Sequence, residues 1–505
     1  MCPRLLGAVR PVHDAAAALA PLGEPAAPLY DWPDVSAPSS SASLAPAWPS
    51  VPDDANALSP GVWPDSATRD ADGIVRLGGI PVTDLRDAFG TPAYILDEDE
   101  VRARARRVLA AFRAATARHG VQTRVYYAGK AFLSTEVARW VTEEGLALDV
   151  CSGGELAVAR AARIESARLG FHGNNKSVAE LEAAVEGGIG SIVLDSPIEA
   201  ERLSAIADRR GIQQPVLIRV NSGVHAETHD FLATAHEDQK FGFSLDDAPG
   251  IVARIRELPG LQLVGLHCHI GSQIFGTSGF RESAARLIEL HAELSADGEL
   301  PVLNLGGGFG IAYTSADDPT PIEELADGIV DAVAQECEVR GIPLPNLAFE
   351  PGRYIVGPAG VTLYEVGTVK PVRAADEATR LYVSVDGGMS DNPRHALYGA
   401  EYSARIASRT SEADAALARV VGKHCESGDI VVDAEYLPAD IAPGDLLAVP
   451  ATGAYCFSLA SDYNYITRPP VIALRGGEAR VIVRRETIDD LLARDVGAAS
   501  TGGDE

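Results

Sequence analysis

Short apolar runs alternate with amphipathic segments through the middle of the chain. Each run ends in polar or glycine-rich residues, and a stretch with helical spacing follows, such as GELAVARAARI. Continuous apolar strands that alternate with helices are typical of a parallel sheet covered on both faces. Eight such units within about 230 residues favour a closed (β/α)8 barrel over a doubly wound open sheet, which usually has fewer strands. The runs span 123–130, 146–152, 167–175, 191–196, 215–222, 261–272, 301–308 and 346–353.

The pattern changes after about residue 354. Segments such as RLYVSVDGG and DIVVDAEYLP are strand-like and separated by Gly, Pro or Asp turns, which predicts a C-terminal domain built as a β-barrel or β-sandwich. The strand-like segment GIVRLGGIPVTDL joins this domain in our interpretation. The predicted order is an extension over 1–56, an N-terminal segment of the β domain over 57–95, the barrel over 96–353, the β domain over 354–490 and a polar tail over 491–505.

Composition and charge narrow the classes of protein that fit. The chain has 505 residues, of which 46% are hydrophobic and 23% charged, as in ordinary globular proteins. Residues 1–56 are rich in Pro, Ala and Ser and lack periodicity, which predicts a disordered or loosely attached segment. The net charge of −28 argues against general binding of nucleic acid, but a locally basic pocket can still take an anionic ligand.

The chain carries no membrane or secretion signal that we recognise. A transmembrane helix needs about 18 consecutive apolar residues, and no such run occurs. Pro11, His13 and Asp14 interrupt what would be the apolar region of a signal peptide, so we expect a cytoplasmic protein. The six cysteines are widely spread and form no CxxC pair, which predicts free thiols and no metal centre.

Chemically capable residues follow the apolar runs. In a barrel the carboxyl ends of all strands meet on one face, where active sites lie. This convergence is the strongest argument from the residues alone that the chain is an enzyme. The residues are Lys130, Asp149, His172, Asn221, His269, Ser272, the glycines 306–308, Glu350 and Arg353.

Lys130 is one of only five lysines and ends the first predicted barrel strand. Burial of a lysine is costly unless its charge is lost or paired, and burial lowers its pKa. A neutral amine can form a Schiff base with an aldehyde such as pyridoxal phosphate (PLP). A lysine at the barrel rim with no chemical role is the alternative.

Two further motifs suit a phosphate or a cofactor ring. The glycines 306–308 in LNLGGGFG follow the seventh strand, where barrel phosphate sites often form, although a tight turn without a ligand has the same pattern. In EPGR, a carboxylate such as Glu350 can keep a pyridine nitrogen protonated, and Arg353 offers a fork for phosphate or carboxylate. A surface turn with an ion pair is the alternative for EPGR.

Histidine and cysteine motifs leave their roles open. In HCHIGSQ a flat imidazole can stack on a cofactor and Ser272 can reach a phosphate, but alternation does not decide between His267 and His269, and a core histidine is the alternative. In KHCESGD, Cys425 beside Glu426 can act as an acid or nucleophile, or as an inert small side chain.

Taken together, ten motifs occur in order between about 124 and 465. They are YYAGKAF, DVCSGGE, HGNNKS, HEDQKFGFS, HIGSQ, GGGFGI, EPGR, VDGGMSDNPRHALYG, HCESGD and ATGAYCFSLASDYN. The chain resembles the diaminopimelate decarboxylases, PLP enzymes of the alanine-racemase-like barrel class. The resemblance covers nearly the whole chain except 1–56 and the tail.

The resemblance implies a cofactor site. Lys130 would be the Schiff-base lysine, and His269 would stack on the pyridine ring. Ser272 and Gly308 would lie near the phosphate, and Glu350 would pair with the pyridine nitrogen. The remaining residues implied to contact the cofactor are Pro351, Gly352, Arg353 and Tyr455.

The resemblance also implies a reaction, the conversion of meso-2,6-diaminopimelate to L-lysine and carbon dioxide. Cys425 would donate a proton, and Cys425 and Glu426 would reach the site from the partner subunit of a homodimer. An arginine can pair the distal carboxylate, which ornithine lacks, and unpaired polar groups reject such an analogue. The residues implied to bind the substrate are Arg353, Arg394, Tyr398, Glu426 and Tyr455.

Three other functions remain open on the residues. Another PLP-dependent amino-acid decarboxylase or a racemase would share the fold. A non-catalytic binding protein of the same fold has no need for both Lys130 and Cys425. A Schiff-base aldolase that works without PLP leaves Glu350 and the glycine run unexplained.

Overall fold

The computed structural model describes residues 44–46, 48–224, 240–373 and 378–498. Most of the predicted extension over 1–56 therefore lies outside the described residues. The same is true of 499–505 in the predicted tail and of the first four residues of the motif HEDQKFGFS.

Eight parallel strands close into a barrel. Each strand pairs in parallel with the next, and the last pairs back with the first. Every strand falls in one of the apolar runs named above, with one strand starting a residue earlier, so the predicted (β/α)8 barrel is confirmed. The strands are β5 (Thr123–Ala128), β6 (Ala147–Val150), β7 (Leu169–Phe171), β8 (Ser191–Leu194), β9 (Gln214–Asn221), β11 (Leu261–His267), β12 (Val302–Asn304) and β13 (Asn346–Phe349), and the short β10 (Phe243–Ser244) extends the sheet beside β9.

Helices follow the barrel strands, and serine caps fix where four of them begin. Ser134, Ser152, Ser177 and Ser196 each accept a hydrogen bond from the backbone N–H three residues further on. Such caps stabilise a helix by roughly 1 kcal/mol each. They start the helix within a few residues of the strand end, which leaves a short turn at the barrel mouth. The helices are α2 (Glu98–Ala117), α3 (Thr135–Glu143), α4 (Gly153–Ala161), α5 (Val178–Glu186), α6 (Pro197–Arg209), α7 (Ala248–Glu257), α8 (Ser278–Ser295) and α9 (Ile322–Arg340), with a short 3-10 turn at Ser166–Arg168.

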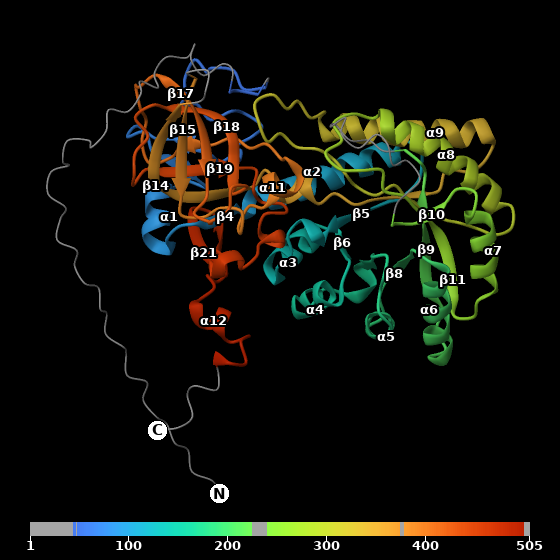
Figure 1. The fold of residues 1–505 in the computed structure, drawn as a ribbon. Coiled ribbons are helices and arrows are strands. Elements are labelled where there is room, and N and C mark those ends of the chain that lie inside the picture. Colours follow the sequence, from blue (N-terminus) through green and yellow to red (C-terminus); the bar gives the residue numbers. More distant parts are fainter. Residues whose placement is uncertain (1–43, 47, 225–239, 374–377, 499–505) are drawn as a thin grey trace, which may run out of the picture. The chain divides into compact units, whose positions relative to one another are not determined.

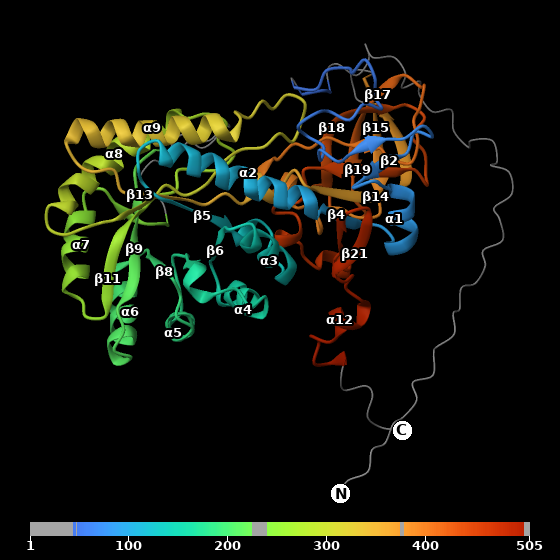
Figure 2. The same cartoon turned by 180° about the vertical axis from the view of Figure 1, so that it is seen from behind.

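A second, mixed sheet has β14 (Gly360–Arg373) at its centre. This long strand pairs with β15 (Thr379–Val385), β19 (Leu446–Pro450) and β4 (Ala93–Asp97), all antiparallel. β4 comes from the N-terminal side of the barrel, and Figures 1 and 2 show it in blue among the orange and red strands. The other strands of the sheet are β16 (Arg405–Ile406), β17 (Ala415–Val421), β18 (Ile430–Pro438), β20 (Val471–Arg475) and β21 (Glu478–Val483).

β4 connects the two sheets directly. It spans the predicted boundary between 95 and 96, and its last residue, Asp97, caps α2 by accepting the backbone N–H of Glu100. The first long helix is thereby fixed to the end of β4, which pairs with β14 on one side and β20 on the other. The smaller elements are β1 (Thr68–Arg69), β2 (Val75–Leu77), β3 (Ile80–Pro81), α1 (Val82–Phe89), α10 (Arg353–Val356), α11 (Arg394–Tyr398) and α12 (Ile488–Leu492).

Two predictions, on the cysteines and on membrane-spanning helices, can be compared with the described part of the chain. The five cysteines in the described ranges are all free thiols. Of the helices in the described part of the chain, none has both the length and the apolar character of a membrane span.

Candidate active site

The lysine turn lies directly after β5. Lys130 is the middle residue of a 3-10 turn, Gly129–Ala131. Position 129 has no room for a side chain, because a Cβ there would lie 2.7 Å from the carbonyl oxygen of Asp149 in β6. The carbonyl of Ala131 accepts a hydrogen bond of 2.8 Å from the backbone N–H of Tyr455. The turn is therefore held between a neighbouring barrel strand and the loop that carries Tyr455.

The side chain of Lys130 is exposed, and the expectation that it is buried at a strand end is wrong. β5 ends at Ala128, two residues earlier, so Lys130 stands in the turn outside the barrel wall. Within the described part of the chain, no hydrogen bond or ion pair holds its ammonium group. The amine is thus accessible to a ligand at the carboxyl ends of the strands.

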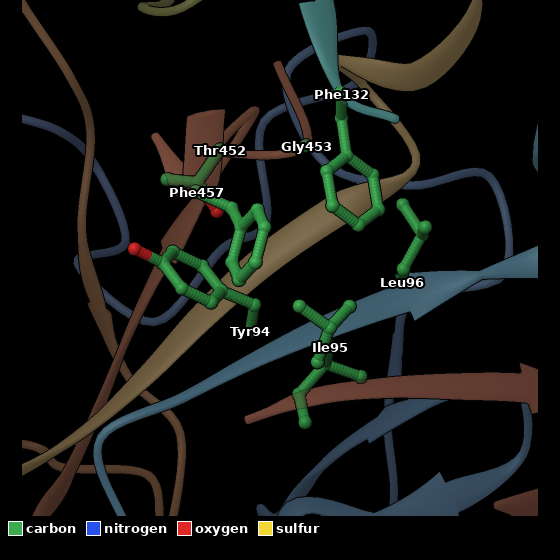
Figure 3. Close-up of a pocket in the computed structure, with 9 residues that line it drawn as sticks. Tyr94, Ile95, Leu96, Phe132, Thr452, Gly453 and Phe457 are labelled. Carbon is green, nitrogen blue, oxygen red and sulfur yellow. The ribbon is translucent and has the colours of Figure 1, made fainter. Parts of the chain in front are cut away.

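Aromatic rings support the lysine turn from the side of the β sheet. Phe132, Phe457 and Tyr94 line a small apolar cavity, which Figure 3 shows with their rings turned toward one another. The Phe457 ring meets the Phe132 ring edge-on at 5.1 Å and the Tyr94 ring at 5.9 Å. The cavity has a volume of about 10 Å³, which is room for one water molecule at most. It is a packing gap behind the turn and not a substrate pocket.

Glu350 lies at the centre of a buried polar cluster at the barrel mouth. It follows β13, and its Oε1 accepts a hydrogen bond of 2.7 Å from the side-chain amide of Asn304. Nε2 of His267 lies 3.1 Å and Nε2 of His172 lies 3.4 Å from the same oxygen. His172 Nε2 is also 3.2 Å from Oδ1 of Asp149. The ends of three strands, β7, β11 and β12, thus deliver polar groups to one carboxylate.

Several atoms of this cluster have no hydrogen-bond partner. They are both carboxylate oxygens of Asp149, Nε2 of His172 and Nδ1 of His267, and all are buried. The short contacts of His172 Nε2 and Asp149 Oδ1, given above, are not aligned as hydrogen bonds. Buried polar groups in folded proteins are normally paired, so each exception needs a reason. The contacts of the Glu350 carboxylate within the described residues all lie at Oε1. Oε2 is therefore left for a ligand, and the cluster fits a polar ring placed against it.

The two carboxyl groups of the cluster, Asp149 and Glu350, have pKa values shifted in opposite directions. Burial and the neighbouring Glu350 raise the pKa of Asp149 well above its usual range. Burial also works to raise the pKa of Glu350, but the adjacent His172 and His267 outweigh it and hold this pKa well below the usual range. Glu350 is therefore the anionic partner and Asp149 the neutral one. Burial lowers the pKa values of His172 and His267 to about 4, which leaves both rings neutral at pH 7.

The glycine turn after β12 lies against the neighbouring strand ends. A Cβ at Gly307 would lie 2.0 Å from the carbonyl oxygen of Glu350, and one at Gly308 would lie 2.3 Å from that of Gly271. Gly308 also has a φ of +102°, which side chains rarely adopt. The backbone N–H of Gly307 donates to Nδ1 of the half-buried His269 over 3.3 Å. His269 and the glycine turn are thus one local unit.

The EPGR segment connects His269 and the glycine turn to β5, the strand that precedes Lys130. The carbonyl of Pro351 accepts a hydrogen bond of 3.2 Å from the backbone N–H of Ala128, and a Cβ at Gly352 would lie 3.0 Å from the Ala128 side chain. Arg353 donates to the hydroxyl of Ser272 over 2.8 Å. The structure therefore brings Ser272, Arg353 and the end of β5 to the same side of the barrel.

Arg353 and Arg394 lie together on a set of tyrosine rings. The guanidinium carbon of Arg353 is 4.7 Å from the centre of the Tyr455 ring, and that of Arg394 is 5.9 Å from the same ring. Arg394 is buried and donates to the hydroxyl of Tyr402 over 2.6 Å. Neither arginine has a carboxylate within ion-pair distance among the described residues. Two cations without counter-ions are an arrangement that suits an anionic ligand.

The loop that carries Cys425 and Glu426 is separate from this cluster. Both side chains are exposed, and none of the hydrogen bonds, ion pairs or ring contacts of the described residues joins them to Lys130 or Glu350. The preceding His424 is buried and fixes the loop, with its Nε2 2.9 Å from the hydroxyl of Ser390. Tyr398 is also exposed, at 67%, at the end of α11.

Asn304, Tyr313 and Tyr402 are site residues that the sequence did not single out. Asn304 is the last residue of β12, so its position at a strand end was a usable signal. Tyr313 and Tyr402 lie outside any strand end, and each is a tyrosine in an irregular segment. Their contacts with the arginines depend on the packing of the barrel against the β sheet, which no local pattern encodes.

A family model places the whole barrel in one class. Residues 99–357 match the model described as pyridoxal-dependent decarboxylase, pyridoxal binding domain. This span contains all eight barrel strands together with Lys130 and Glu350. The barrel is therefore a pyridoxal-binding domain of the pyridoxal-dependent decarboxylase class.

Relatives of known name narrow the class to one family. The diaminopimelate decarboxylases of Mycobacterium tuberculosis and Corynebacterium efficiens are 53% and 50% identical to this chain, over 87% and 88% of its length and 98% and 96% of theirs. A solved diaminopimelate decarboxylase from M. jannaschii matches with a TM-score of 0.79 at 30% identity, covering 86% of this chain and 98% of that one. One from Helicobacter pylori, complexed with L-lysine, has a TM-score of 0.73 at 28% identity and covers 82% and 98%. The chain belongs to the diaminopimelate decarboxylase family.

Proposed function

We propose that this chain removes one carboxylate from meso-diaminopimelate and releases L-lysine and carbon dioxide, with PLP as its cofactor. The observation that carries this proposal is the buried cluster around Glu350, whose free oxygen and unsatisfied neighbours suit a pyridine ring. The identity to named relatives over nearly their full length supports the substrate.

The residues of the barrel mouth account for each part of the cofactor. Lys130 would hold it covalently through its accessible amine, and Glu350 would keep a proton on the ring nitrogen. His269, fixed by Gly307, would lie against the ring, while Ser272 and Gly308 would hold the phosphate. Bound PLP supplies an electron sink for the carbanion that remains when the carboxylate leaves.

The groups described beside Glu350 add no second negative charge to the cluster. A carboxylate holds a proton on a ring nitrogen only while it is itself anionic. Asn304 and His267 surround Oε1 without adding a second negative charge, and Asp149 is neutral. In this arrangement Glu350 is the anionic group beside the proton on the ring nitrogen, and Asp149 does not add a second charge.

Charge matching accounts for the choice of substrate. The chain has a net charge of −28, so an anionic substrate needs a local positive site. Arg353 and Arg394 provide two guanidinium groups that have no counter-ion among the described residues, and Tyr398 and Tyr455 would add contacts to the distal end of the substrate. Glu426 would pair the distal ammonium. Ornithine lacks the distal carboxylate and would leave a buried arginine unpaired.

We propose further that Cys425 and Glu426 act in the site of a second copy of the chain. Cys425 would donate a proton to the carbon that lost its carboxylate. Exposure of both side chains, and the absence of any contact between their loop and the barrel cluster among the described residues, support a homodimer in which the two loops are exchanged. A cytoplasmic location agrees with the five free thiols of the described ranges.

The experiment that tests the proposed function is a product assay. Purified protein with PLP is offered meso-diaminopimelate, and lysine and carbon dioxide are measured, with ornithine and arginine in parallel. We expect lysine and carbon dioxide from diaminopimelate and no product from the other two. L-Alanine is offered as a fourth substrate, and formation of D-alanine from it would point to a racemase. Absence of both product and a PLP absorbance band would contradict the proposal.

A further inference from the structure

Tyr313 lies between the two arginines of the site. It belongs to the segment that follows the glycine turn, and its side chain is buried. Its hydroxyl accepts a hydrogen bond from Nη1 of Arg353. The face of its ring is 4.8 Å from the guanidinium carbon of Arg394. One side chain thus contacts both cations through two different groups.

A second tyrosine completes the support of Arg394. Its guanidinium donates to the hydroxyl of Tyr402, and the Tyr402 ring meets the Tyr313 ring edge-on at 5.1 Å. Tyr402 is fully buried, so it fixes the ring of Tyr313 as well as the arginine. Tyr313 therefore links the position of Arg394 to that of Arg353, in addition to the Tyr455 ring that both guanidinium groups approach.

The Tyr313 side chain offsets the repulsion between the guanidinium groups of Arg353 and Arg394. Guanidinium groups repel each other, and burial strengthens the repulsion. The negative face of an aromatic ring attracts a cation within about 6 Å, and the guanidinium carbon of Arg394 lies 4.8 Å from the Tyr313 ring. Arg353 is held by the hydroxyl oxygen of the same side chain, at the edge of the ring. Within the described residues no carboxylate neutralises either arginine. A carboxylate from a ligand is the missing partner.

We infer that Tyr313 is a positioning residue that sets Arg353 and Arg394 to share one carboxylate of the ligand. Through them it makes the site prefer a ligand that has this carboxylate over one with an amine alone. The inference rests on the proposed function, because that function supplies a ligand with a distal carboxylate. Neither the motifs nor the resemblance assigns a role to this tyrosine.

Two ligands isolate the effect of Tyr313. L-Lysine retains the distal carboxylate, whereas 1,5-diaminopentane is the same molecule without it. Dissociation constants of both are measured on the PLP-loaded enzyme from the change in cofactor absorbance. We expect Tyr313→Phe to weaken lysine binding about threefold to tenfold, because the hydroxyl contact to Arg353 is lost and the ring remains. We expect at least a tenfold loss in Tyr313→Leu, with diaminopentane binding unchanged in both variants.

The β sheet offers a matched control pair. Arg419 donates to the hydroxyl of Tyr382 over 3.3 Å, and its guanidinium carbon lies 5.8 Å from that ring. Tyr382→Leu removes an arginine–tyrosine contact of the same kind on strands β15 and β17. We expect it to bind lysine and diaminopentane as the wild type does.

The outcomes separate the inference from the function on which it rests. A wild type that shows no preference for lysine over diaminopentane contradicts the proposed function itself. A wild type with that preference, retained in both Tyr313 variants, overturns only the role of Tyr313. Equal weakening of both ligands in Tyr313→Phe shows a general structural role and also overturns the inference, since the conservative variant keeps the ring and its packing.

Discussion

The side-chain amide of Asn304 donates a hydrogen bond of 2.7 Å to Oε1 of Glu350. The other end of the same amide is also fixed, because its Oδ1 accepts the backbone N–H of Gly306 over 2.9 Å. Asn304 therefore connects the carboxylate to the glycine turn. This side chain, together with the backbone hydrogen bond of 2.8 Å from Glu350 N–H to the carbonyl of Gly306, joins two regions proposed to contact opposite ends of the cofactor.

Loss of the Asn304 amide is expected to weaken cofactor binding. A hydrogen bond to a charged group contributes about 1.5–3 kcal/mol, so Asn304→Ala should raise the dissociation constant for PLP roughly tenfold to a hundredfold. The measurement is a titration of cofactor-free protein with PLP, followed by absorbance. Asn346→Ala is the control, because Asn346 starts the strand that Glu350 follows and lies at its far end. Equal affinities in the two variants would contradict a role for Asn304.

Replacement of Lys130 tests the covalent attachment of the cofactor. In Lys130→Ala we expect the absorbance band of lysine-bound PLP to disappear and turnover to fall at least about 10³-fold, because no other amine lies in this turn. Lys370→Ala removes an exposed lysine of the β sheet and should leave both unchanged. An undiminished band in Lys130→Ala would move the attachment to another lysine.

Cys425 is expected to affect turnover but not cofactor binding. General acid catalysis contributes about 10²–10⁴-fold, so Cys425→Ala should bind PLP normally and turn over at least a hundred times more slowly. The control is Cys151→Ala, which removes another exposed free thiol. Wild-type turnover in Cys425→Ala would assign the proton donor elsewhere.

A mixture of two inactive variants tests whether Cys425 acts across a dimer. Co-expressed Lys130→Ala and Cys425→Ala chains form heterodimers in which one site has an intact lysine from one chain and an intact cysteine from the other. If the loops are exchanged, random pairing should restore up to about a quarter of the wild-type turnover. If Cys425 serves its own chain, no site is complete and the mixture stays inactive.

The sequence predicts the barrel well because its signals are local and repeated. Each apolar run corresponds to one strand, and the closed barrel follows from eight such runs. The residues at the strand ends, such as Glu350 and His172, are brought together by that topology alone. The sequence does not predict that Glu350 is anionic and Asp149 neutral. These charge states depend on which side chains are buried beside each carboxyl group.

The sequence is less informative where function depends on packing between the sheets. The apolar run that ends at Lys130 predicts a buried strand end there, but β5 ends two residues earlier and the turn exposes the lysine. Tyr313 and Tyr402 contact the arginines only because irregular segments of the barrel and the β domain meet. The contacts that orient the substrate-binding groups are therefore found from coordinates and not from spacing.

The buried His267 is expected to make the protein less stable in acid. Burial lowers its pKa to about 4, whereas an unfolded histidine titrates near pH 6.5. The unfolded chain therefore takes up a proton that the folded chain refuses, and stability that is fully present above about pH 6.5 is lost as the pH falls toward 4. Between pH 7 and 5 this single group should cost about 2 kcal/mol.

His267→Gln isolates that contribution. Urea unfolding midpoints are compared at pH 7 and 5 on protein freed of cofactor, so that proton uptake is not mixed with release of PLP. The raised pKa of Asp149 has the opposite sign, because the folded state there holds a proton that the unfolded state releases, and it cancels to first order in the comparison with wild type. We expect the midpoint of the wild type to fall further than that of His267→Gln. An equal fall in wild type and His267→Gln would mean that His267 is protonated in the folded protein, and Glu350 would then face a cation in place of a neutral ring.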